Sequence, residues 1–132
     1  MDAEQDKALW SRLLDIGYLA MSLGMFDRAI GIFQGLAAYR PQSEHPVIGH
    51  ALTLLRLRKR TEAIDLLRNE ALKRNPESDL AKGIYGLALQ LSGNKIESEI
   101  IFNQVVKANR DPEAVKFARA FLDLPNAAGT TP

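Results

Sequence analysis

Few side chains in this sequence have the types and spacing that chemistry requires. The two histidines, His45 and His50, lie five residues apart, which does not align them on one helix face, and no carboxylate follows at ligand spacing. Cysteine is absent, which excludes disulfides, thiolate chemistry and cysteine-based zinc sites. The sequence also lacks a glycine-rich phosphate loop and a serine nucleophile elbow. We therefore expect no enzyme activity, no metal and no cofactor.

A basic run at residues 56–60, RLRKR, is the feature that suggests nucleic acid. No aromatic residue interleaves with it, and 17 basic against 16 acidic residues give a net charge of only +1, so we interpret the run as a solvated turn between helices. The first residues, MDAEQDK, carry acid where a signal peptide carries base, and no apolar run reaches transmembrane length. We expect a soluble, cytoplasmic protein that does not bind nucleic acid or insert into a membrane.

The strongest candidate for a functional surface is a set of apolar residues on three predicted helices. Each helix carries a trio whose steps of three, four or seven residues place it on one helix face. The trios are Leu14, Tyr18 and Met21; Ile48, Leu52 and Leu55; and Leu80, Leu87 and Leu91. Such a surface suits the apolar side of a helix from another chain. The alternative is that these residues are core, covered by the long N-terminal helix, the C-terminal helix or a second copy of the chain.

Helix pairs must position these trios. The first pair is predicted at about 3–23 and 26–39, with Asp2 and Gln5 as a capping arrangement and Gly24 in the turn. The second pair is predicted at 46–57 and 61–74, and the third spans 79–109 with its turn at 92–94. A final helix starts at 111–113, DPE, and runs to about residue 124. Its charged face holds Glu113, Lys116, Arg119 and Asp123, and its apolar face holds Ala114, Phe117, Ala118 and Phe121.

The helix pairs are copies of one repeat. Gly17, Ala29 and Phe33 recur 34 residues later as Ala51, Ala63 and Leu67, and 35 residues after that as Gly86, Ser98 and Phe102. Each unit ends at a proline: Pro41, Pro76 and Pro112. We expect the small residues to let the two helix backbones approach, with Phe33 and its equivalents filling the next gap. Within the first helix, packing against its own pair is assigned to Leu13, Ile16, Gly17 and Ala20.

This repeat resembles the tetratricopeptide (TPR) family at the residues just named. Leu13 stands where a tryptophan is common, Arg58 replaces a turn glycine, and Ser98 replaces an alanine. The resemblance implies an all-α solenoid of three helix-turn-helix repeats plus a C-terminal capping helix. We expect a single domain over residues 1–125, followed by a flexible tail at 126–132. In TPR proteins the face that carries the three trios lines a concave groove.

The layout is similar to that of the small TPR chaperones of bacterial type III secretion systems, over about residues 8–124. That resemblance implies a chaperone that holds a helical segment of an aggregation-prone secretion subunit, as a homo- or hetero-oligomer. The alternative is a general TPR scaffold or self-associating adaptor with no secretion role. The co-chaperone type that holds the C-terminal carboxylates of heat-shock proteins needs lysines and asparagines on this face. Here Leu14 and Tyr18 occupy the matching positions, so a carboxylate clamp is excluded.

Overall fold

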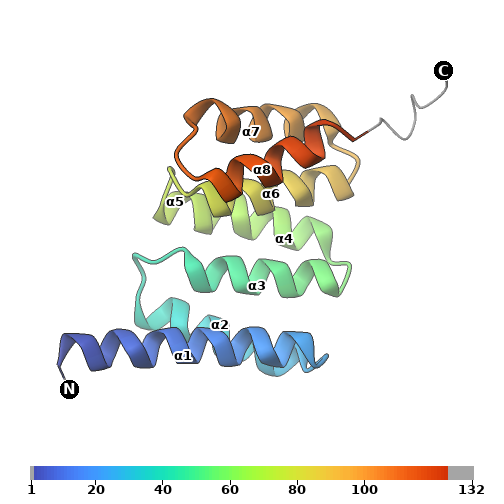
Figure 1. Cartoon of the computed structure of the whole chain (residues 1–132). Helices are drawn as coiled ribbons and strands as arrows, with labels where there is room; N and C mark the ends of the chain where they lie inside the picture. The colour runs from blue at the N-terminus through green and yellow to red at the C-terminus, as the bar shows by residue number, and fades with distance from the viewer. Residues whose placement is uncertain (1, 125–132) are drawn as a thin grey trace. The chain divides into compact units, whose positions relative to one another are not determined.

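The computed structural model describes residues 2–124, and over this range it contains helices and no strand (Figure 1). The helices are α1 (Ala3–Ser22), α2 (Phe26–Tyr39), α3 (His45–Arg56), α4 (Arg60–Leu66), the π-helical turn η1 (Leu67–Ala71), α5 (Leu72–Arg74), α6 (Asp79–Leu91), α7 (Lys95–Ala108) and α8 (Pro112–Leu122). The chain divides into two compact units between Ser78 and Asp79. The all-α prediction is confirmed. The single domain over 1–125 stays a prediction, and the predicted tail at 126–132 lies outside the described residues.

All three helix pairs turn by the same hydrogen bond. The backbone N–H of Met25 donates to the carbonyl of Ala20 at 2.8 Å, and the equivalent bonds, Lys59 to Leu54 and Asn94 to Leu89, have the same length. This six-residue closure requires one residue with positive φ just after the helix. Gly24 (φ 77°) and Gly93 (φ 85°) supply it cheaply, whereas the second pair uses Arg58 at φ 62°. The turn geometry is therefore kept where the glycine is lost, at a strain of roughly 1 kcal/mol.

The core of each pair is a large side chain set against a small one. Phe33 is fully buried. Its ring lies over Gly17, where an added Cβ would come within 2.7 Å of the ring. The same ring also lies over Gly49 of α3. Phe102 covers Gly86 in the same way, at 2.6 Å. We expected two backbones to approach at Gly17, and this was wrong, because an aromatic ring takes the space. In the second pair, Leu67 stands at the position of Phe33 and Ala51 at the position of Gly17. Both are fully buried, so a smaller large residue goes with a larger small one.

Irregular spacing between repeats is absorbed locally. From the large core residue to the terminating proline there are eight residues in the first unit, nine in the second and ten in the third, from Phe33, Leu67 and Phe102 respectively. The second unit accommodates its extra residue as the π-helical turn Leu67–Ala71, directly after the core leucine. The third places Asn109 in the left-handed conformation after α7. The prediction of an uninterrupted α-helix over 61–74 missed the π turn.

Two other predictions about the helix pairs have opposite outcomes. Ile16 was assigned to packing within the first pair, but it is 50% exposed, because it lies beside the buried face marked by Trp10, Gly17 and Ala20. Ser98, in contrast, keeps its predicted place in the core: its hydroxyl donates to the carbonyl of Gly86 at 2.8 Å. A serine is accepted there because its polar atom has a partner.

The final helix covers the last pair. Asp111 caps α8 by accepting a hydrogen bond from the backbone N–H of Glu113 at 3.0 Å, as predicted. α8 packs on α7 and α6, burying Ala118 and stacking Phe121 against Phe102 with ring centroids 5.4 Å apart. The four charged residues of its other face, Glu113, Lys116, Arg119 and Asp123, are exposed. The predicted amphipathic cap is confirmed.

Candidate functional site

In the first unit, the α1 trio belongs partly to the core. Leu14, Tyr18 and Met21 are half-buried and pack against the cluster of Ala20, Ala29 and Phe33. Tyr18 meets Phe33 edge-on, with ring centroids 5.0 Å apart, and burial raises the pKa of its hydroxyl. These side chains offer only their outer parts to a ligand.

The α3 trio is divided. Ile48 is fully buried, so it is a core residue and we leave it out of the candidate surface. Leu52 and Leu55 are half-buried. The α3 helix therefore contributes less to the candidate surface than its sequence suggests.

The α6 trio is the most open. Leu80 and Leu91 are 48% and 44% exposed, and Leu87 is half-buried. Ile84, which the sequence interpretation missed, lies on the same face, which we call the apolar stripe of α6, at steps of four, three and four residues from Leu80 to Leu91. That spacing could have identified it. It is buried, at 8% exposed, and lines a cavity beside the three leucines.

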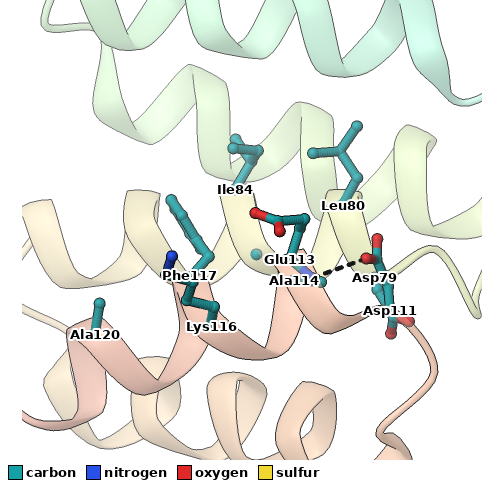
Figure 2. Close-up of a pocket in the computed structure, with 10 residues that line it drawn as sticks. Asp79, Leu80, Ile84, Asp111, Glu113, Ala114, Lys116, Phe117 and Ala120 are labelled. Carbon is teal, nitrogen blue, oxygen red and sulfur yellow. Dashed lines mark hydrogen bonds between the residues drawn. The ribbon is translucent and has the colours of Figure 1, made fainter.

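A cavity of about 520 Å³ lies beside this stripe, between α6 and α8. Figure 2 shows Leu80 and Ile84 projecting from α6, and Ala114, Phe117 and Ala120 from α8. Gly83 also lines it. The sequence interpretation did not find this cavity, because the spacing of α8 residues does not say which part of α6 they face.

Gly83 explains why the cavity exists. The repeat spacing of 34 and 35 residues makes Gly83 the equivalent of Leu14 and Ile48 in the first two repeats. A Cβ at position 83 would lie 3.4 Å from the Phe117 ring, an ordinary contact. The third repeat thus lacks the side chain that would fill this space, and the gap is left open to a ligand.

The rim of the cavity is charged, and two of its four charged residues have structural roles. Asp79 accepts hydrogen bonds from the Arg110 guanidinium at 2.9 and 3.3 Å, and Asp111 caps α8. Glu113 and Lys116 are exposed. An apolar floor with a polar rim suits binding of an apolar side chain from a partner and leaves the partner's polar groups in water.

The residues considered for other chemistry lie apart from this cavity. The basic run forms the turn between α3 and α4, as predicted, and the Arg56 guanidinium stands over the Phe26 ring at 5.5 Å. Burial lowers the pKa of His50, against the opposing charges of Glu70 and Glu62. Within residues 2–124, no group of three or more acidic or histidine side chains could hold a metal ion. In the same range, no helix is long and apolar enough to span a bilayer.

Comparison with known proteins identifies the fold. No family model and no curated protein matches the sequence. Among solved structures, the chain is similar to the Yersinia enterocolitica type III secretion translocator chaperone SycD, with TM-score 0.74 and 12% identity over 89% of this chain and 91% of that one.

Two further structures are similar, with slightly lower TM-scores. A type III secretion complex from Aeromonas hydrophila has TM-score 0.70 and 21% identity, covering 87% of this chain and 77% of that one. The second TPR domain of human RPAP3, in complex with an HSP70 peptide, has TM-score 0.67 and 20% identity, covering 83% and 92%. The chain therefore has the TPR fold, as its repeat predicted.

Proposed function

We propose that this protein is a TPR protein-binding module that takes an amphipathic helix of a partner on the apolar stripe of α6. The observation that carries the proposal is the cavity at Gly83, which lies beside exposed leucines on a helix whose opposite side is core. The stripe from Leu80 to Leu91 extends about 16 Å along the helix axis, at 1.5 Å per residue. That length matches about three turns of a bound helix, which would place one large apolar side chain in the cavity.

The finer proposal is that the protein acts in the cytoplasm as a chaperone for an aggregation-prone subunit of a type III secretion system. Its support is the apolar stripe, together with the likeness of the fold to SycD and to the Aeromonas complex. In the first unit, the outer parts of Leu14, Tyr18, Met21, Leu52 and Leu55 remain proposed contact residues for a partner. The alternative function is a general TPR scaffold without a secretion role.

Binding of an acidic peptide, such as the HSP70 peptide SGPTIEEVD seen with RPAP3, is disfavoured. Such a peptide needs cationic and amide groups facing it. On the first helix of this chain the corresponding face presents Leu14 and Tyr18 instead.

The decisive variant is Gly83→Leu, which restores the side chain type found at Leu14. Its Cβ would lie 3.4 Å from the Phe117 ring, which is van der Waals contact with a side chain and not with backbone, and the rest of the leucine would occupy the cavity or displace that ring. Replacing a mid-helix glycine gains up to about 1 kcal/mol of helix propensity, which offsets the cost of packing against Phe117, and a thermal melt checks that the variant is folded. Gly35→Leu is the matched control, because an added Cβ there meets nothing within 4 Å.

The readout is affinity capture of partners from the source cells with the parent, Gly83→Leu and Gly35→Leu. We expect one small helical partner, insoluble when expressed alone and soluble with the parent protein, to be lost with Gly83→Leu and kept with Gly35→Leu. A partner that persists with a correctly folded Gly83→Leu would overturn binding at this cavity. A partner that needs no help to stay soluble would favour the scaffold over the chaperone.

A further inference from the structure

The turn between α3 and α4 concentrates positive charge. We call Arg56, Arg58, Lys59 and Arg60 the basic turn; all four side chains are exposed. Within residues 2–124, none of the four forms an ion pair. This local excess stands in a chain whose net charge is only +1. The positive charge is therefore gathered at one place and is open to an anionic partner.

The backbone conformation of Arg58 points to a role for its charge. The other two helix pairs place Gly24 and Gly93 at the equivalent position, with φ of 77° and 85°, whereas Arg58 has φ 62°. A glycine would make the same turn without strain. Residues held in sparsely populated backbone regions gather at functional sites, where the strain is kept for another purpose. The second pair thus keeps a cation at the end of its turn at a cost to folding.

The basic turn offers side chains to a ligand, because its backbone donors are already used. The N–H of Lys59 donates to the carbonyl of Leu54 at 2.8 Å, and the N–H of Arg58 donates to that of Leu55 at 3.0 Å. These two N–H groups are not available to hold a single phosphate. Long exposed cations suit instead a broad anionic surface, to which each adds attraction by charge alone.

Exposed apolar residues lie at the same end of the first unit. Leu23 and Met25, in the turn between α1 and α2, are 66% and 38% exposed. The Arg56 guanidinium stands over the Phe26 ring at 5.5 Å, which brings the end of α3 to the start of α2, and Figure 1 shows both turns at this end of the unit. Nucleic acid gains little from a leucine and a methionine, whereas at a bilayer such residues sit among the headgroups beside bound cations.

We infer that this end of the first unit, the basic turn together with Leu23 and Met25, binds the surface of an anionic lipid bilayer. The cations supply attraction to the lipid headgroups, which acts within about 10 Å at moderate salt. The two apolar side chains add contact at the headgroup level without spanning the bilayer. None of these residues belongs to the proposed binding site on α6, so the inference does not rest on the proposed function.

The first test is co-sedimentation of the full chain with vesicles of phosphatidylglycerol and phosphatidylcholine in equal parts. We expect the parent to bind these vesicles, to be released by high salt and to ignore vesicles of phosphatidylcholine alone. Arg58→Gly keeps the turn and relieves its strain while removing one cation. It should bind about five-fold more weakly, although its thermal melt shows a fold at least as stable as the parent.

Lys107→Gln is the matched control for charge. Lys107 is an exposed cation in the last turn of α7, and its removal changes the net charge by the same amount. This variant should bind the vesicles like the parent. A parent that does not bind anionic vesicles, or an Arg58→Gly variant that binds them as tightly as the parent, would overturn the inference.

The second test separates lipid from other anions. Leu23→Ser/Met25→Ser leaves every charge in place and should weaken vesicle binding about five-fold or more, whereas Ile96→Ser, at a residue 79% exposed on α7, should not. Full vesicle binding by the double variant, or tighter binding of the parent to duplex DNA or polyglutamate at the same salt, would contradict a bilayer as the partner. Arg58→Gly should still capture the partner that depends on Gly83, so the two proposals can fail separately.

Discussion

The first and last helix pairs each bury a phenylalanine ring, but only the last pair is covered by a further helix of the described chain, α8. In the first pair Phe33 covers Gly17, in the last Phe102 covers Gly86, and both rings are essentially inaccessible. Over the last pair α8 adds two more rings to Phe102 and turns charged residues outward. Within the described residues the first pair has no such helix, and its outer side remains apolar.

This difference shows that a repeat specifies its interior and leaves its outer sides to whatever adjoins it. A helix pair of this type always carries apolar residues for its neighbours. Where the chain supplies an amphipathic helix, as at 112–122, those residues become core. Where it does not, the same kind of residue stays exposed, as Leu9, Ile16 and Leu23 of α1 do.

The largest effect is expected from removing the buried rings. Phe33→Ala and Phe102→Ala should each lower the free energy of unfolding by roughly 3–5 kcal/mol. Phe102→Ala should cost more, because Phe102 contacts two rings, Phe117 and Phe121, whereas within residues 2–124 the ring of Phe33 pairs only with that of Tyr18. Each aromatic pair adds about 0.5–1.5 kcal/mol. Urea denaturation followed by circular dichroism measures both. If Phe33→Ala proved the more costly, the account of α8 as the better cover would be wrong.

An intermediate effect is expected at the glycine beneath the ring. Gly17→Ala should destabilise the protein by about 1–3 kcal/mol, since the new Cβ would lie 2.7 Å from the Phe33 ring. Gly31→Ala in α2 has open space around it and should instead stabilise by about 0.5–1 kcal/mol. Thermal melts of the two variants separate packing from helix propensity. Equal shifts of the same sign would contradict the ring-on-glycine packing.

The smallest effect concerns pH and distinguishes the two units. Burial lowers the pKa of His50 below its ordinary 6.5, so the folded state takes up this proton less readily than the unfolded state. The stability of the first unit should be full above pH 6.5 and decline as the pH falls through the lowered pKa. Hydrogen exchange at pH 7.5 and 5.5 should show this loss in the first unit alone, since both histidines lie there. His50→Gln should abolish it, and a loss that persists would assign the effect to other groups.

Much of the fold could be predicted from local patterns. The bounds of α2, the capping box of α1 and the start of α8 agree with the sequence interpretation, because they depend on residues within one turn of each other. The large core residues followed from the repeat spacing. The π turn did not, because one extra residue can be absorbed in a helix or in a loop at similar cost.

The candidate site was less predictable. Nine apolar residues shared a pattern, yet Ile48 is core and Leu80 is open. Residues of the same type at the same helical spacing differ in exposure only through the elements that pack on them, and a single sequence does not show those elements.

The sequence by itself determined the helix pairs, their turns and the match between ring and glycine, since these depend on short spacings and on side-chain size. Only the tertiary structure decided which apolar side chains remain exposed and where a cavity forms. The opening at Gly83 needs both a missing side chain on α6 and the Phe117 ring of α8 beside it. Likewise, Arg74 reaches back 31 residues to donate to the carbonyl of Ser43 at 3.1 Å. Such contacts join residues distant in sequence, and their geometry is fixed only when the helices pack.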